Sequence, residues 1–141
     1  MTAEIFDCLS DRAREMKEAQ SKYKVVFLAT AANARNPDLY FLHLRYSEDA
    51  VSLYVIFRSS QHLRKVVSIL DPVADFFMID IERKGDYQTL YDDCLGIVDR
   101  KKAFPFSPNS ITAFGVQGFL GGIRGEALPN SKIALCGLGN V

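Results

Sequence analysis

The sequence predicts an α+β fold with antiparallel strands and two amphipathic helices. Residues 39–46 and 51–58 alternate in polarity and are joined by a short polar turn, as in an antiparallel hairpin. Residues 3–21 and 60–70 carry apolar side chains at spacings of three and four, which is the helical period. With two further apolar runs as strands, these elements form an α+β or barrel domain.

Composition and charge narrow the possible classes of protein. The chain has 141 residues, of which 48% are hydrophobic, enough for one domain with a buried core. Its 17 basic and 17 acidic residues cancel, so we expect no nucleic-acid or membrane partner. No apolar run is long enough to span a membrane. Cys8, Cys94 and Cys136 are odd in number and far apart, which indicates reduced thiols and a cytoplasmic protein, and with two histidines no metal site is expected.

The first half of the chain supplies a helix and three strands. Residues 3–21 form the first helix, with an apolar stripe of Ile5, Leu9, Ala13, Met16 and Ala19. Residues 24–31 are a continuous apolar run, which is typical of a strand buried on both faces. In residues 39–46, strict alternation would place Tyr40 and Leu44 on one face and Arg45 on the other. Residues 51–58 complete the hairpin.

The second half begins with a short helix. Its buried stripe in residues 60–70 consists of Leu63, Val66, Val67 and Leu70, and Pro72 ends it. Residues 73–82 form the fourth strand. Residues 87–94 fit either a short helix or a short strand, and residues 96–104 indicate a weaker strand.

Beyond Phe104 the composition changes. Residues 105–125 hold two prolines and five glycines and no charge before Arg124. Such an apolar stretch needs cover, either from its own core or from a second copy of the chain, and we expect a homodimer. We therefore interpret residues 1–141 as a single domain in which 105–141 form an atypical apolar, glycine-rich C-terminal extension.

One stretch of the chain indicates a chemical function. Arg58, Ser59 and Ser60 lead from the third strand into the second helix, and His62 and Lys65 lie in its first turns. Free N–H groups and the positive end of the helix dipole gather at such a point, which suits a phosphate. The alternative is a solvated helix start with one capping serine.

Two other features have plainer interpretations. His43 lies within a strand, where a histidine is usually a half-buried polar residue. Residues 132–141 resemble the opening of a dinucleotide-binding fold, with Gly137 and Gly139 after an apolar run. The helix that would hold the pyrophosphate does not follow in this sequence, so we expect a final edge strand there.

The order of the elements resembles the pyridoxamine 5′-phosphate oxidase-like flavoproteins, whose fold is the FMN-binding split β-barrel. The resemblance covers residues 5 to about 104 and rests on six stretches: FLATAA, DLYFLHLRY, SLYVIFRSS, LRKVVSIL, Asp71-Pro72 and VADFFMI. It implies a split antiparallel β-barrel of about six strands with short flanking helices, with residues 95–98 as the fifth strand. It also implies a homodimer that binds FMN between its subunits.

The resemblance also implies which residues bind the cofactor. The phosphate would contact Arg58, Ser59, Ser60 and His62, and backbone around Ala29 and Thr30 would lie near the flavin ring. His62 stands where such proteins often have a lysine, and Arg64 or Lys65 would compensate if the helix turns them inward.

Two functions follow from these observations. The first is an FMN-binding oxidoreductase that acts on a small molecule, with the catalytic residues unassigned because the cofactor carries the chemistry. The alternative is a cofactor-free, dimeric α+β module that senses a ligand or binds a protein. A degenerate barrel that dimerises without chemistry is a third interpretation.

Overall fold

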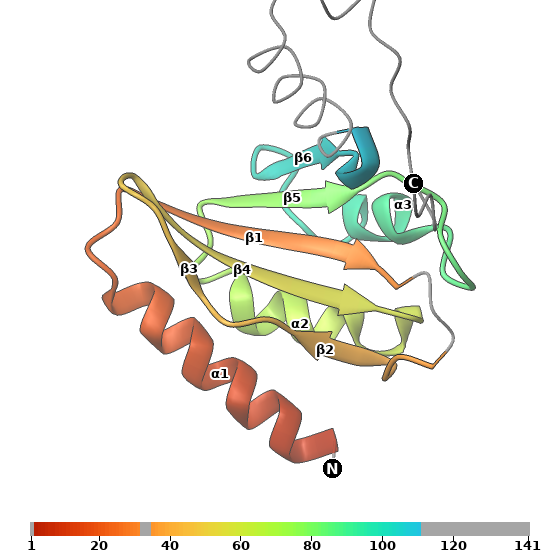
Figure 1. Cartoon of the computed structure of the whole chain (residues 1–141), viewed down its shortest axis with the longest axis horizontal. Helices are drawn as coiled ribbons and strands as arrows, with labels where there is room; N and C mark the ends of the chain where they lie inside the picture. Colours follow the sequence, from red (N-terminus) through yellow and green to blue (C-terminus); the bar gives the residue numbers. More distant parts are fainter. Residues whose placement is uncertain (1, 32–34, 111–141) are drawn as a thin grey trace, which may run out of the picture. The chain divides into compact units, whose positions relative to one another are not determined.

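The computed structural model describes residues 2–31 and 35–110, which form a six-stranded mixed sheet with helices packed against it (Figure 1). All the elements below belong to one compact unit, residues 1–106, and of the second unit, 107–141, residues 107–110 are described. In chain order the elements are α1 (Thr2–Glu18), β1 (Tyr23–Thr30), β2 (Leu39–Phe41), β3 (Arg45–Tyr46), β4 (Ala50–Phe57), η1 (Ser60–His62), α2 (Leu63–Leu70), β5 (Phe76–Asp80), α3 (Leu90–Leu95) and β6 (Ala103–Phe106).

The sheet is mostly parallel. Its strand order is β2-β4-β1-β5-β6, with β3 paired to β4. Strand β1 runs parallel to both β4 and β5, and β5 runs parallel to β6. Helix α2 carries the chain from β4 to β5, which flank β1, and such a crossover allows the two strands it joins to run in the same direction. In chain order the four parallel strands therefore lie 2-1-3-4 across the sheet.

The combination of helices with a six-stranded sheet is confirmed, but the predicted antiparallel arrangement is wrong for most of the sheet. The hairpin between residues 39–46 and 51–58 is antiparallel as predicted, because β2 and β3 both run antiparallel to β4. The other pairings are parallel, and in residues 2–31 and 35–110 the sheet ends at β2 and β6 without closing into a barrel.

A β-bulge corrects the predicted alternation of residues 39–46. Tyr40 pairs with Ile56, whereas Arg45 pairs with Ser52, so four residues on this strand lie opposite three on β4. The extra residue shifts the alternation by one position. Tyr40 and Arg45 consequently lie on the same face of the sheet and not on opposite faces.

The region after β5 also differs from its prediction. Residues 90–95 are helical, which decides between the two alternatives for 87–94, and the buried side chains are Leu90 and Cys94. The predicted fifth strand at 95–98 is wrong: the N–H groups of Ile97 and Val98 both donate to the Cys94 carbonyl in a turn that closes α3. The strand predicted at 96–104 forms later, as β6.

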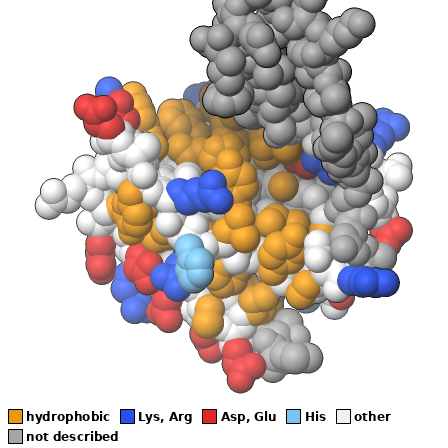
Figure 2. Space-filling view, viewed as in Figure 1, with side chains coloured by type: hydrophobic (Ala, Val, Ile, Leu, Met, Phe, Trp, Pro, Cys, Tyr) orange, Lys and Arg blue, Asp and Glu red, His pale blue; other side chains and the backbone are white. Residues whose placement is uncertain are grey.

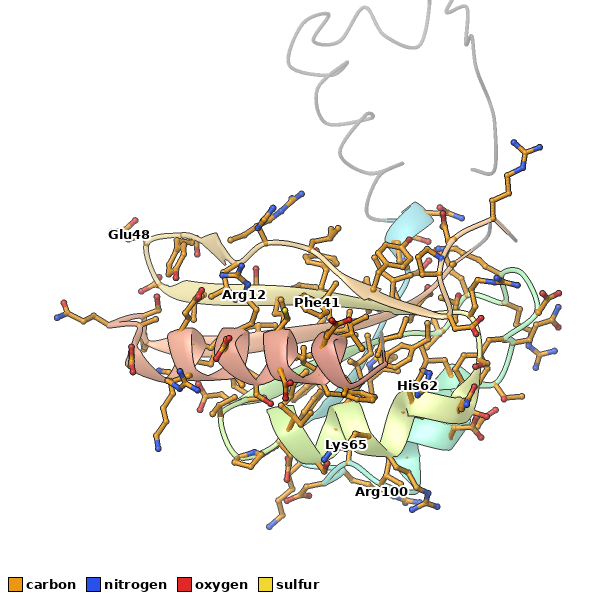
Figure 3. The ribbon with its side chains drawn as sticks, turned by 90° about the horizontal axis from the view of Figure 1, so that it is seen from below. Arg12, Phe41, Glu48, His62, Lys65 and Arg100 are labelled. Atoms are coloured by element: carbon orange, nitrogen blue, oxygen red, sulfur yellow. The ribbon has the colours of Figure 1, made fainter. Side chains whose placement is uncertain are left out.

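One face of the sheet and the three α-helices enclose the core. Every second residue of β4 is fully buried, from Val51 to Phe57, and the same holds for Phe77 and Ile79 of β5. The helices contribute Leu9, Met16, Leu63, Val66, Leu70, Leu90 and Cys94 to the same cluster. Seen from below, the helices lie on one side of the strands (Figure 3). Among the described residues no helix is long and apolar enough to cross a membrane.

The opposite face of the sheet carries aromatic side chains that range from buried to exposed. Phe27 stacks on Tyr54 with ring centroids 4.2 Å apart, and Phe106 meets Phe27 edge-on at 5.3 Å. Arg45 lies over the Tyr54 ring at 5.8 Å, and Phe104 is 42% exposed. Figure 2 shows hydrophobic side chains gathered on this face. We call it the open face. Of the apolar stretch 105–125, for which we predicted cover from its own core or from a second copy of the chain, residues 111–125 lie outside the described residues.

Candidate functional site

The parallel strands end at a common edge of the sheet, and polar residues follow them there. Thr30 ends β1, Arg58 follows β4 and Asp80 ends β5. In open sheets with parallel strands, ligands bind outside the carboxyl ends of the strands. The predicted site residues therefore lie at this edge of the sheet and on the helix that starts beside it, η1–α2.

Arg58 is bound by carbonyl and carboxylate groups of the chain itself. Its Nη1 donates a 2.9 Å hydrogen bond to the carbonyl of Asn36, and its backbone N–H donates to the carbonyl of Asp38 at 2.9 Å. The carboxylates of Asp38 and Asp86 lie 3.7 and 3.9 Å from the guanidinium, whose side chain is 27% exposed. Arg58 thus joins the loop before β2 to the loop after β5.

The other predicted residues of the helix start point in different directions. The Ser59 hydroxyl is buried and has no hydrogen-bond partner among the described residues, and it does not cap the helix. His62 packs edge-on against Phe6 of α1, with ring centroids 5.6 Å apart (Figure 3). Lys65 lies on α2 and is exposed (Figure 3). Ser60 is also exposed.

Ala29 and Thr30 lie on opposite faces of the sheet. Ala29 belongs to the open face, whereas Thr30 is buried, and its N–H and Oγ1 reach Oδ2 of Asp80 at 3.4 and 3.5 Å. Asp80 has a fully buried side chain, accepts a 2.8 Å bond from the Glu82 N–H and lies 3.5 Å from Lys84 Nζ. A buried carboxylate needs such partners. Sequence reasoning missed this cluster, although its acid–x–acid–x–lysine pattern at a strand end was the available signal.

A groove lies between η1–α2 and the end of α3. Its upper part has a volume of about 260 Å³ and is lined by Ser60, Gln61, Leu63, Arg64, Asp93 and Ile97. A second hollow of about 450 Å³ shares Arg64 and Ile97 and adds Val67, Ser68, Asp71, Pro72 and Gly96. Because they share residues, we treat the two hollows as one α2–α3 groove. Of the residues that the resemblance assigns to FMN, Ser60 lines it.

Three charged side chains line the α2–α3 groove, and they differ in their partners. Asp71 is paired with Lys102, whose Nζ lies 3.2 Å from Oδ1. Oδ2 of Asp93 accepts hydrogen bonds from the Tyr87 hydroxyl at 2.8 Å and from Thr89 Oγ1 at 3.1 Å. Arg64 forms no ion pair with any residue that the structure describes. Within the described part of the chain, the groove therefore offers a ligand a cation without an ion-pair partner.

Two titratable groups beside the groove keep their protons. Burial and the hydrogen bond to Asp93 raise the pKa of Tyr87 far above its usual range, so its hydroxyl remains a donor. Burial, followed by the charge of Asp93, raises the pKa of Cys94 to about 12. A thiol that stays protonated is a poor nucleophile. In the described part of the chain, no group of three His, Cys, Asp or Glu side chains could hold a metal ion.

No family model, no curated protein and no solved structure matches this chain. The resemblance to the split-barrel flavoproteins therefore stays a prediction.

Proposed function

We propose that the protein binds a phosphorylated small molecule in the α2–α3 groove, with FMN as the ligand. The observation that carries the proposal is that Arg64 and Ser60, one turn apart at the start of η1–α2, line the same hollow while Arg64 has no ion pair among the described residues. A guanidinium and a hydroxyl are donors that suit phosphate oxygens. Arg64 thus takes the role that the sequence assigned to Arg58.

The rest of the groove suits the remainder of a mononucleotide. Leu63, Val67, Pro72 and Ile97 supply apolar walls beyond the charged end. The choice of FMN follows from the resemblance of the element order to the split-barrel flavoproteins, in which the phosphate would be held after the third strand, and the groove begins at Ser60 just after β4. The proposal does not require a split barrel. A barrel would form only if the edge strands β2 and β6 were joined.

An FMN-dependent oxidoreductase that acts on a small molecule is the activity that follows. The flavin would supply the hydride transfer, and the chain would bind and orient it. Ser60 and Arg64 would contact the phosphate, and the apolar walls would exclude water from the ring.

A fluorescence-quenching titration with FMN tests this proposal. We expect saturable quenching by the full chain, and Arg64→Ala should weaken it by about tenfold or more, because a hydrogen bond to a charged group is lost. Lys65→Ala is the matched control, since it removes the same charge from a neighbouring residue that does not line the groove. Equal losses in the two variants, or no quenching of the unmodified chain, would contradict the proposal.

A second candidate function, an interaction module that forms a homodimer, is favoured by the open face. Mostly parallel sheets normally have both faces covered, and here aromatic side chains such as Phe104 remain exposed. Sedimentation velocity of the full chain should show a dimer, and Phe104→Asp should make it a monomer. Tyr46→Asp is the control, because Tyr46 is 64% exposed but pairs with Val51 on the other face. A monomeric unmodified chain would rule out this candidate.

A further inference from the structure

Asp93 lines the α2–α3 groove, and hydrogen bonds from two neighbouring hydroxyl groups hold its carboxylate in place. Both Tyr87 and Thr89 donate their hydroxyl hydrogens to the same oxygen, Oδ2. Among the described residues no donor bonds to the other oxygen, Oδ1. Because the raised pKa of Tyr87 keeps its donor in place, the carboxylate holds one orientation and leaves one oxygen open as an acceptor.

The hollow that Ser60 and Arg64 line carries two charges of opposite sign, and neither forms an ion pair among the described residues. Arg64 and Asp93 both line it, and no ion pair joins them. Farther along, the charge of Asp71 is balanced by Lys102. A bare phosphate would gain from Arg64 but would be repelled by Asp93. A ligand that also carries hydroxyl groups would satisfy both, because its phosphate oxygens accept from Arg64 and its hydroxyl donates to Oδ1 of Asp93.

We infer that Asp93 is a specificity-determining residue, and that the α2–α3 groove selects a phosphorylated polyol or sugar over inorganic phosphate. The inference rests on the proposed phosphate site at Arg64 but not on the flavin ring. The ribityl phosphate of FMN belongs to this class, and so do simple sugar phosphates.

The test measures binding of ribose 5-phosphate, inorganic phosphate and O-phosphoethanolamine to the full chain by isothermal titration calorimetry at low ionic strength. Asp93→Asn is nearly isosteric and can still accept hydrogen bonds from Tyr87 and Thr89. We expect it to weaken ribose 5-phosphate about tenfold, because a bond to a charged acceptor is lost. We expect the same variant to strengthen inorganic phosphate about twofold or more, because a like charge is removed. Asp92→Asn, an exposed neighbour that does not line the groove, should change both affinities slightly and in the same direction.

A second variant keeps the inference testable if Asp93→Asn unfolds the chain. Asp93→Glu retains the charge but displaces the acceptor oxygen. It should therefore weaken the binding of ribose 5-phosphate and leave the affinity for inorganic phosphate unchanged.

Three results would overturn the inference. If Asp93→Asn strengthens the binding of both ribose 5-phosphate and inorganic phosphate, Asp93 only competes with the ligand for Arg64. If O-phosphoethanolamine binds more tightly than ribose 5-phosphate, the groove selects an amine and not a hydroxyl. If neither phosphate nor ribose 5-phosphate binds, the inference and the proposed function fail together. Opposite shifts for the two ligands, without any binding of FMN, would support the inference and reject the flavin alone.

Discussion

Arg58→Ala should destabilise the fold and leave the affinity for phosphate ligands unchanged. The substitution removes the 2.9 Å hydrogen bond from Nη1 to the Asn36 carbonyl, and a bond that involves a charged group contributes about 1.5–3 kcal/mol. Partial exposure of the side chain, 27%, lowers that figure. The ion pairs with Asp38 and Asp86 are long and mostly exposed, and such pairs add about 0–1 kcal/mol. We therefore expect a loss of about 1–2 kcal/mol.

Urea unfolding followed by circular dichroism measures this loss. With an m-value of about 2 kcal/mol/M, the midpoint should fall by about 0.5–1 M at constant slope. Arg64→Ala is the matched control: its side chain is exposed and has no ion pair among the described residues, so its stability should stay within about 0.5 kcal/mol of the unmodified chain. The reasoning would be refuted if Arg58→Ala were as stable as the unmodified chain, or if it abolished phosphate binding while remaining folded.

Further predictions concern the core and the buried titratable groups. Phe77→Ala should cost about 3–5 kcal/mol in urea unfolding because Phe77 is fully buried, whereas Phe104→Ala, at an exposed edge, should cost about 1 kcal/mol; similar losses would contradict the assigned core. Iodoacetamide near neutral pH should modify the exposed Cys8 and spare the buried Cys94, which peptide mass spectrometry would show, and equal labelling would contradict the burial. The pKa of Cys94 is raised from 9.0 to about 12, so its stabilising effect is complete below pH 9.0 and is lost as the pH rises toward 12. The pKa of Tyr87 is raised from 10.0, so the melting temperature should fall further above pH 10, and a melting temperature independent of alkaline pH would count against both assignments.

The parallel sheet could have been predicted from the sequence. The continuous apolar run at residues 24–31 is typical of a central parallel strand, and β1 is flanked by parallel strands on both sides. The helix at 60–70 separates two strands, as in a parallel crossover unit. The antiparallel prediction came from the hairpin at residues 39–58, extended to the whole sheet, and from the resemblance, and neither takes account of these two patterns.

The bulge in the hairpin had no comparable signal. Leu42 and Leu44 are apolar, and either alternation would give them an acceptable position. The register of this strand against β4 depends on the residues that pair with Tyr40 and Arg45, and these pairings are tertiary contacts. Local polarity alone therefore could not place Arg45 over Tyr54 on the open face.

The groove that we propose as the site begins at the helix start that the sequence indicated, but it is not lined by most of the residues named from the sequence. The helix start after β4 does open into a groove, yet Arg58 and Arg64 could not be told apart by position. The partners of Arg58, Asn36 and Asp86, lie far away in the sequence and meet it only in the folded chain. The direction of Arg64 depends on its place on the helix and on α3, which was an ambiguous segment.

A nuclear magnetic resonance titration of the ¹⁵N-labelled full chain with FMN tests the central claim most directly, because it locates the ligand without assuming an activity. The amide signals of residues 60–64 and 93–97, on the two sides of the α2–α3 groove, should shift and saturate together. Saturable shifts confined to Ala29, Thr30 and Arg58 would place the ligand at the strand ends and contradict the groove. An unchanged spectrum would contradict FMN binding altogether.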